Sequence, residues 1–212
     1  MHATQDSRET ETRWQDRARA DHYAGERFAA GHGDRDVRLV RRLIERFDGD
    51  SSSRELLDVP AGTGRLAAGL ADLGTACGVD VSAAMLEHSD YARDHRGLIA
   101  DARCLPFAAD TFDVCVACRL LHHQADAALV SVLAELLRVS RRLVVVSFWD
   151  AASLPEWRKR FGLRKRTDAR RSISRRHFAE LAARAGGELL GHAASLRFVS
   201  PQTFAALRRK PR

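Results

Sequence analysis

The chain has 212 residues, of which 45% are hydrophobic and 30% are charged. That length fits one ordinary domain, whose core is large enough to fold without disulfides or a structural metal. No apolar run is long enough to span a bilayer, and residues 1–19 lack the apolar centre of a secretory signal, so we expect a cytoplasmic protein.

The net charge of +7 is concentrated in one segment. Arg158 to Arg176 holds ten Lys or Arg and a single acid, Asp168, so the rest of the chain is slightly acidic. Such a segment could cover the substrate, lie on an anionic surface, dock an acidic partner, or be solvated without a specific partner. It could also neutralise nucleic-acid phosphates, but the sequence contains no recognisable RNA-reading module.

The four cysteines include a C-x-x-C pair, Cys115 and Cys118. Such a pair can bind metal or do redox chemistry, but the second pair that a zinc site needs is absent. Both lie in or beside an apolar run, where a reduced cysteine behaves as a small hydrophobe. We therefore favour a buried strand and predict no metal site.

The N-terminal part of the chain is predicted to be helical. Residues 1–13 contain few apolar side chains and should be disordered. A helix is expected over 14–28, and a turn at 31–34 should provide an N-cap at Asp34 for a second helix that ends near Phe47.

Short apolar strands then alternate with helical segments. Leu66, Leu70 and Leu73 follow helical spacing, with Gly74 placed to stop that helix, and Ser82 caps the next helix. This alternation predicts a parallel sheet covered by helices on both faces. The expected strands are 55–59, 76–79, 98–100, 112–117 and 142–148, and a further helix is expected over 125–137.

The C-terminal part begins with a helix that Ser174 caps and that runs through Ala185. Residues 188–198 are strand-like. Residues 202–209 are ambiguous, because Ser200-Pro201 would start a helix well.

A glycine-rich turn follows the first strand. Gly62 and Gly64 allow the backbone to approach a ligand closely, and helix N-terminal N–H groups there suit an anionic group. Asp80 ends the second strand, 22 residues after Asp58, and a carboxylate at that place can accept both hydroxyls of a ribose. Together these residues indicate a nucleoside-containing ligand.

Four motifs in order resemble those of the class I S-adenosylmethionine-dependent methyltransferases, in the ubiquinone/menaquinone-methyltransferase-like (Methyltransferase type 11) group. The resemblance covers about residues 23–210, with one departure: Pro60 stands where the group has its first glycine. The motifs are Leu56 to Gly64, Gly78 to Leu86, Asp101 to Phe107 leading to Thr111–Val114, and Leu120 to His123.

The resemblance implies an α/β fold: a Rossmann-like, seven-stranded, mostly parallel sheet with helices on both faces, an antiparallel last strand and an N-terminal helical cap. It therefore favours a strand over 202–209. It also implies one methyltransferase domain over 14–212, whose parts are a cap (14–47), a cofactor-binding core (54–150), a basic substrate-side segment (151–176) and C-terminal helix and strands (177–212).

The resemblance further implies that the chain binds S-adenosyl-L-methionine. Asp58 would organise the loop and the methionine ammonium group, while Asp80 would bind the ribose hydroxyls. Asp101 would accept a hydrogen bond from the adenine amino group. The remaining implied contacts are Ala61, Gly62 and Gly64 along the methionine and ribose, Val81 and Met85 at the adenine face, the Ala102 amide toward the ring, and the Arg119 backbone carbonyl near the sulfonium.

Three of these residues have plain structural alternatives. Asp58 could cap the following helix, Met85 could be ordinary core, and Asp101 could be a turn former.

His122 and His123 form the titrating pair nearest the implied reaction centre, and His123 is our candidate general base. The alternative is that one histidine caps the helix starting near Asp126 while the other is exposed. Methyl transfer can also proceed without a base, because a sulfonium is a good leaving group and alignment supplies much of the rate.

The function implied is in-line methyl transfer to a small-molecule or lipid-like acceptor, and an anionic acceptor would suit the basic segment. One alternative is an RNA methyltransferase using residues 158–176, although the Asn-Pro-Pro-Tyr-type motif of base-amino methyltransferases is missing after the fourth strand. Another is a non-catalytic adenosyl-binding protein of the same fold. A nicotinamide-dependent oxidoreductase should show G-x-G-x-x-G, but Ala67 replaces its third glycine.

Overall fold

The structure is a computed structural model that describes residues 32–49, 53–160, 171–194 and 202–211, together with Arg17, Ala20 and Asp21. The expected disordered tail, most of the expected helix over 14–28 and part of the basic segment lie outside the described residues. The division into a cap, a core and a substrate-side segment stays a prediction.

The described strands form one mixed sheet with the order β3-β2-β1-β4-β5-β8-β7. Strands β1 to β5 are parallel, and β8 runs antiparallel to both of its neighbours. This confirms the predicted Rossmann-like sheet and the strand over 202–209, and adds a two-residue strand, β6, paired with β5. The strands are β1 (Arg54–Asp58), β2 (Gly74–Asp80), β3 (Gly97–Ile99), β4 (Phe112–Ala117), β5 (Ser140–Asp150), β6 (Ser172–Ile173), β7 (Gly187–Ala194) and β8 (Gln202–Arg209).

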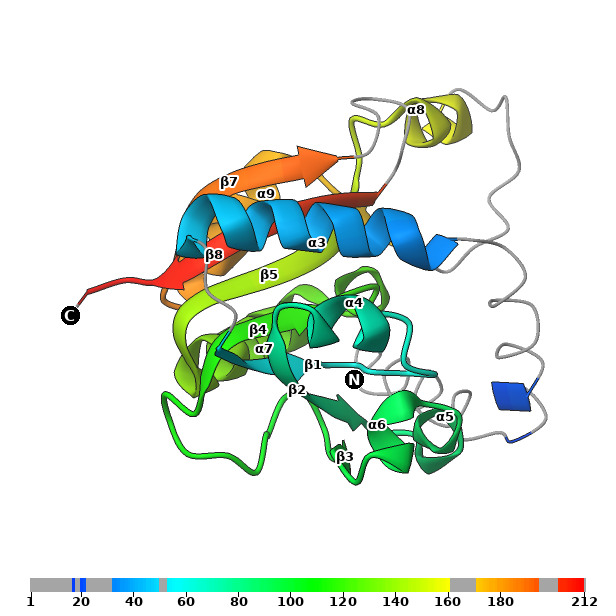
Figure 1. The fold of residues 1–212 in the computed structure, drawn as a ribbon. Helices are drawn as coiled ribbons and strands as arrows, with labels where there is room; N and C mark the ends of the chain where they lie inside the picture. The colour runs from blue at the N-terminus through cyan, green and yellow to red at the C-terminus, as the bar shows by residue number, and fades with distance from the viewer. Residues whose placement is uncertain are drawn as a thin grey trace.

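Helices cover both faces of this sheet (Figure 1). Helix α3 packs against β5, β7 and β8 and beside α4, whereas α7 and α9 pack against the opposite face. The helices are α3 (His32–Asp48), α4 (Ala67–Ala71), α5 (Ala83–Glu87), α6 (Asp90–Arg93), the 3-10 turn η1 (Leu121–His123), α7 (Asp126–Val139), α8 (Leu154–Arg160) and α9 (Arg175–Arg184).

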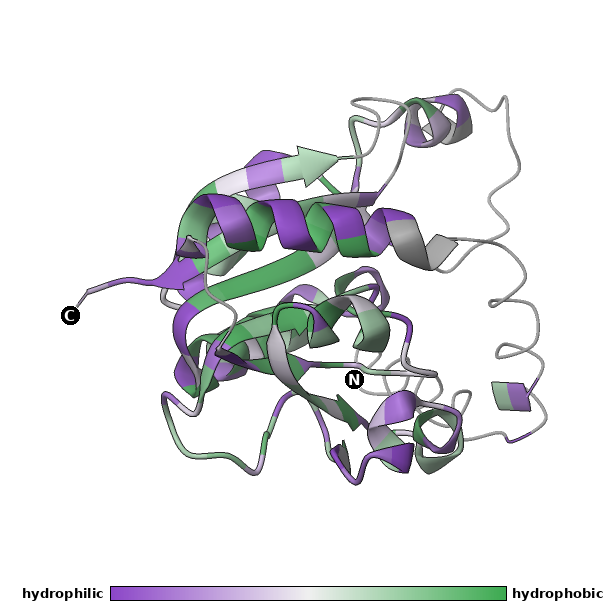
Figure 2. Cartoon of the chain, in the orientation of Figure 1, coloured by the Kyte–Doolittle hydropathy of each residue, from purple (hydrophilic) through white to green (hydrophobic). Residues whose placement is uncertain are grey.

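Alternation along the central strands builds two cores. In β4, Val114 and Val116 face the core under α3 and α4, while Cys115 and Ala117 face the core under α7 and α9. A strand buried on both faces is apolar on both faces, as Figure 2 shows for the green middle part of β5. Cys115 is fully buried, in accord with its interpretation as a strand residue. Among the described residues, no group of His, Cys, Asp or Glu could hold a metal ion.

Two predicted helix starts are confirmed by their caps. The Ser82 hydroxyl accepts the Met85 N–H at 3.2 Å, and the Ser174 hydroxyl accepts the His177 N–H at 3.1 Å. Each cap satisfies a backbone donor that the first helical turn leaves unpaired.

Two predicted boundaries are wrong. Helix α3 begins at His32, so Asp34 lies inside the helix and is not its N-cap. Helix α4 ends at Ala71, and Gly74 does not stop it but begins β2. A Cβ on Gly74 would lie 2.2 Å from the Arg54 carbonyl oxygen, so this glycine permits the close approach of β1 and β2. In the part of the chain that is described, no helix is long and apolar enough to cross a membrane.

Candidate functional site

The candidate site lies where the parallel strands end and the strand order reverses between β1 and β4, the usual ligand-binding edge of an open α/β sheet. The loop after β1 turns tightly there, with Gly62 and Gly64 at φ 53° and 76°. Both values lie in the left-handed region that favours glycine. The Ala61 N–H donates to the Val79 carbonyl at 2.8 Å, which ties the loop to β2.

Gly64 also has a packing role. A Cβ at this position would lie 3.0 Å from the Ser89 Cβ, just before α6. The peptide bond between Val59 and Pro60, where the motif departs from the family pattern, is cis.

Asp80 is held against this loop. Its carboxylate accepts the Gly62 N–H at 2.7 Å and the Ser82 N–H at 2.9 Å, and the residue is 6% exposed. Burial raises the pKa of Asp80, although the N–H groups of Ser82, Gly62 and Val81 oppose the rise. The glycine-rich loop is therefore hydrogen-bonded directly to Asp80, the residue predicted to bind the ribose.

Asp58 is buried and accepts the Tyr91 hydroxyl at 3.1 Å. Burial, followed by the Asp58 charge, raises the pKa of Tyr91, so the phenol stays a neutral donor. Leu66 is the N-cap of α4, so the alternative in which Asp58 caps that helix is wrong. Tyr91 was not predicted as a site residue. A glycine at position 78, inside an apolar strand, was the available signal, because a Cβ there would lie 2.2 Å from the Tyr91 ring.

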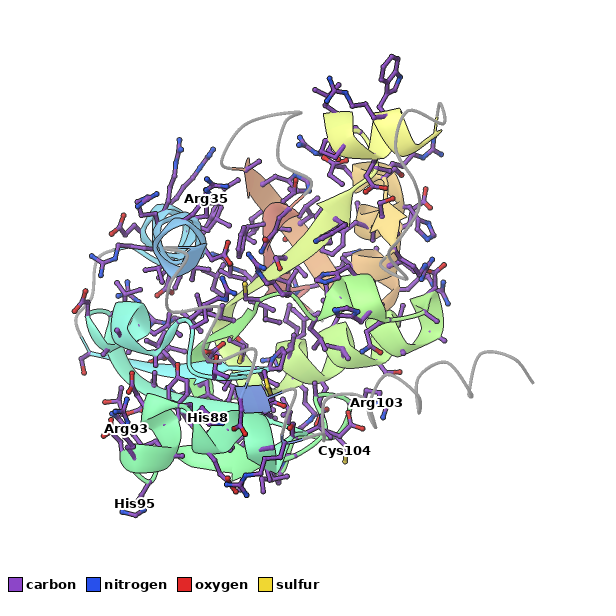
Figure 3. The ribbon with its side chains drawn as sticks, turned by 90° about the vertical axis from the view of Figure 1, so that its right-hand side faces the viewer. Arg35, His88, Arg93, His95, Arg103 and Cys104 are labelled. Carbon is purple, nitrogen blue, oxygen red and sulfur yellow. The ribbon has the colours of Figure 1, made fainter. Side chains whose placement is uncertain are left out.

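Asp101 follows β3, which pairs with β2 beside Asp80. Its carboxylate accepts the Arg103 backbone N–H at 2.8 Å and the Arg103 Nε at 2.9 Å. Partial burial raises the pKa of Asp101, but the hydrogen bonds and charge of Arg103 outweigh it and leave the pKa below its ordinary value. Arg103 and Cys104 lie together at the outer edge of the molecule (Figure 3). Asp101 is therefore a turn residue whose oxygens are already shared with an arginine.

The apolar residues predicted to contact the adenine follow Asp80 and Asp101 in the chain. Met85 in α5 is 5% exposed, and Val81 and Ala102 are half-buried. Burial of Met85 fits both a core role and a role beneath a ligand ring.

Arg119 follows β4 with a positive φ of 62°, which is uncommon for a residue with a side chain. Its N–H donates to the Ser147 hydroxyl at 2.7 Å, and its Nε donates to Asp36 in α3 at 3.1 Å. The contact with Asp36 was missed because it joins residues 83 positions apart.

The histidine pair lies in η1, directly after the β4 loop. The rings of His122 and His123 lie 4.2 Å apart, and the His122 ring stacks on Trp149 at 5.1 Å. His122 is buried and His123 is half-buried, so neither is the exposed residue of the alternative interpretation. Ala125 is the N-cap of α7, so no histidine occupies that cap.

Arg171, in the C-terminal part of the basic segment, is hydrogen-bonded to this turn. The Arg171 N–H donates to the His122 carbonyl at 2.8 Å, and its guanidinium donates to Asp126 at 2.9 Å. Two further cations of the segment are also paired, Arg175 with Asp150 and Arg176 with Glu180. Part of the segment's positive charge is therefore balanced within the molecule.

Comparisons with known proteins agree with this geometry. Residues 56–142 match the protein-family model described as "Methyltransferase domain". This stretch begins in β1 and includes the glycine-rich loop, Asp80, Asp101 and the histidine pair. The part of the chain that carries the candidate site is therefore similar to a methyltransferase domain.

One curated relative and two solved structures illustrate the similarity. A demethylmenaquinone methyltransferase of Beutenbergia cavernae is 37% identical over 125 residues, which is 57% of this chain and 50% of the relative. The match therefore spans about half the length of the curated relative.

The magnesium protoporphyrin IX methyltransferase of Synechocystis PCC 6803, solved with bound SAH, superposes with a TM-score of 0.67 at 18% identity, covering 84% of each chain. The [4+2]-cyclase SpnF superposes with a TM-score of 0.62 at 19% identity, covering 82% of this chain and 80% of its own. Likeness at this level establishes the methyltransferase fold alone, and the cyclase illustrates that one fold hosts different reactions.

Proposed function

We propose that this chain transfers a methyl group from S-adenosylmethionine to a small-molecule acceptor. The observation that carries the proposal is the position of Asp80, buried at the end of β2 and bonded to the Gly62 N–H at 2.7 Å. A carboxylate beside a glycine-rich loop at this edge of the sheet suits a ribose.

The chemistry of Asp80 leaves room for that ribose. Each carboxylate oxygen has two acceptor positions, and the Gly62 and Ser82 N–H groups donate to different oxygens of the carboxylate. The two ribose hydroxyls would therefore complete the carboxylate without displacing the loop. In this proposal Val81 and Met85 pack against the adenine. Asp101, beside Arg103, accepts a hydrogen bond from the adenine amino group.

The methyl donor supplies a sulfonium-bound methyl with a good leaving group. The protein's contribution is to bind the donor and the acceptor, to orient them and to exclude water. In-line alignment of the two reactants supplies much of the rate. The loop at Ala61, Gly62 and Gly64 holds the donor's amino-acid end, and Arg119 lies at the turn where the acceptor approaches. His123 takes up a proton where the acceptor loses one.

A small-molecule acceptor is supported by the name of the curated relative, a demethylmenaquinone methyltransferase. The His122 ring stacks on Trp149 of β5 and lies 4.2 Å from the tilted ring of His123, and such a group of rings suits a planar or apolar acceptor. The internal pairing of Arg171, Arg175 and Arg176 removes part of the charge that would otherwise favour nucleic acid.

The test is a screen of cell extract with donor carrying a radiolabelled methyl group. We expect label in the small-molecule or lipid fraction with the natural chain and with Asp72→Asn, a control in which an exposed carboxylate paired with Arg41 is neutralised. Asp80→Asn should transfer no label. Label in the RNA fraction would overturn the acceptor class, and equal transfer by Asp80→Asn would overturn the ribose contact.

A further inference from the structure

Helix α3 carries a stripe of exposed arginines on the side that faces away from the sheet. Arg35, Arg38, Arg42 and Arg46 are all exposed, and they follow one another at intervals of three or four residues. Side chains at such intervals lie on one side of a helix, so this arginine stripe is about 16 Å long. Figure 3 shows Arg35 at the outer side of α3. The exposed Glu45 offsets only one of the four charges.

The other sides of α3 contact the rest of the molecule. Its apolar residues, Val40 and Ile44 among them, are buried in the core that α3 covers. Its ion pairs with other described residues are made by Asp36, Arg41 and Asp48. Within the described ranges, no carboxylate forms an ion pair with the arginine stripe, which therefore faces solvent and suits an external anion.

Helix α8 presents exposed apolar side chains beside further cations. Leu154 and Trp157 are 41% and 52% exposed, and their spacing places them on one side of the helix. Arg158 is exposed next to Trp157, and Lys159 and Arg160 follow it in the chain. Tryptophan and leucine with Lys or Arg around them are the composition of a helix that lies in a membrane interface.

The one acid of α8 is directed toward the sheet. Glu156 is half-buried and accepts the Ser172 hydroxyl of β6 at 2.9 Å. Figure 1 and Figure 3 both draw α3 and α8 on the same side of strands β1 to β3, with α8 farther out. A broad, flat partner on that side can therefore meet both helices.

The chemistry of the two helices favours a bilayer over a nucleic acid. Nucleic-acid phosphates would suit the arginines, but an exposed Leu154 has no role on a phosphate backbone. The ring of Phe47, at the end of the stripe, is half-buried and lies under the Arg46 guanidinium, 5.0 Å from its centre, so it is not a platform on which a base could stack. Anionic phospholipids use both features, because their phosphates suit arginine and their interfacial layer suits tryptophan.

We propose that α3 and α8 form a docking surface for an anionic phospholipid bilayer. The arginine stripe contacts the headgroup phosphates, and Leu154 and Trp157 enter the interfacial layer. The proposal is independent of the proposed function, because none of these residues is assigned to the donor or to the acceptor.

The test is vesicle flotation with the full chain. Vesicles of phosphatidylcholine alone are compared with vesicles in which a quarter of the lipid is phosphatidylglycerol. The natural chain should float only with the anionic vesicles, and its binding should weaken as the salt concentration rises, because exposed charges are screened. Equal binding to both kinds of vesicle, or to neither, would overturn the proposal.

Two double variants locate the surface. Arg38→Gln/Arg42→Gln should bind the anionic vesicles about 25-fold more weakly, because each cation near an anionic surface contributes about fivefold to the affinity. Arg93→Gln/Arg96→Gln is the matched control, since it removes the same charge from exposed arginines in and after α6, away from α3 and α8 (Figure 3). It should bind like the natural chain, and an equal loss in both variants would assign the binding to net charge and overturn the proposed surface.

Trp157→Phe tests the apolar contact separately. Brominated phospholipids quench the fluorescence of a tryptophan that enters the interface, so they should quench the natural chain strongly and Trp157→Phe much less, although the variant still floats. Undiminished quenching in Trp157→Phe would show that α8 does not enter the bilayer.

An RNA oligonucleotide of mixed sequence distinguishes the other polyanion. It should bind the natural chain more weakly than the anionic vesicles do at the same salt concentration. If the RNA binds more tightly, and Arg38→Gln/Arg42→Gln loses that binding, the stripe is a nucleic-acid surface and the bilayer proposal is overturned.

Discussion

At the scale of single residues, Asp80 experiences opposing effects. Its burial disfavours the charged form, while the backbone N–H groups of Gly62 and Ser82 favour it, and the outcome is a pKa above the ordinary value. A ribose hydroxyl donates to an ionised carboxylate, so binding of the proposed donor depends on the protonation state of this residue.

We therefore predict that the affinity for S-adenosylhomocysteine falls as the pH is lowered through the raised pKa of Asp80. The stability of the ligand-free chain should depend on pH in the opposite direction. A carboxyl with a raised pKa contributes fully to the free energy of unfolding below its unfolded-state pKa, and this contribution is lost as the pH rises through the folded-state pKa. Calorimetric titrations across acidic pH check the prediction. Asp80→Asn should bind weakly with a flatter pH profile, whereas Asp72→Asn should follow the natural chain; parallel profiles for the natural chain and Asp80→Asn would contradict it.

His123 gives a second residue-scale prediction. If the acceptor loses a proton on methylation, His123→Gln should lower kcat by about 10²- to 10⁴-fold, the usual contribution of a general base. The acidic limb of the kcat pH profile should disappear with it. His95→Asn is the matched control, because His95 is exposed beyond α6 (Figure 3) and Asn tolerates its positive φ of 54°. An unchanged profile in His123→Gln would show that alignment alone suffices.

At the scale of elements, the packing of α3 on α4 fixes the position of Asp36. A Cβ on Gly69 of α4 would lie 2.3 Å from Val37 Cγ1, and Val37 is the neighbour of Asp36. A β-branched side chain cannot rotate away easily, so the two helices approach this closely only because position 69 is glycine.

Gly69→Ala should therefore lower the free energy of unfolding by about 1–3 kcal/mol, the usual cost of overpacking. The double variant Gly69→Ala/Val37→Ala should recover most of that loss, because it removes the methyl groups that collide. Denaturant unfolding of the two single variants and the double variant measures the coupling. If the two losses in the free energy of unfolding were additive, the contact between Gly69 and Val37 would not be the reason for glycine at position 69.

Elements were predictable where the signal is local or continuous. The apolar run predicted the first and last residues of β4 correctly. Ser82 and Ser174 predicted helix starts because a cap is a contact within one turn. Gly74 was misinterpreted because a helix stop and a close approach of strands both require glycine. Only the neighbouring Arg54 carbonyl distinguishes them, and that contact depends on the pairing of β1 with β2.

At the scale of the whole molecule, the order of the strands assembles the site. Gly62, Asp80 and Asp101 follow or end consecutive strands, so the parallel sheet brings them to one edge. The spacing of Gly62 and Asp80 predicted this for those two residues, and the family resemblance implied it for Asp101. Arg103, Tyr91 and Asp36 were not predicted as site residues. Tyr91 and Asp36 make contacts 33 and 83 positions away, which no short motif contains.

The fold limits the chemistry without choosing it, because structures of similar fold include a methyltransferase and a [4+2]-cyclase. The choice between reactions depends on which ligand occupies the edge formed by the glycine-rich loop and Asp80.

The most direct measurement is a crystal structure of this chain grown with S-adenosylhomocysteine. Our account predicts the ribose hydroxyls within hydrogen-bonding distance of the Asp80 carboxylate and the adenine beside Met85 and Asp101. Density for the ligand at another edge of the sheet, or for a ribose that does not touch Asp80, would contradict it.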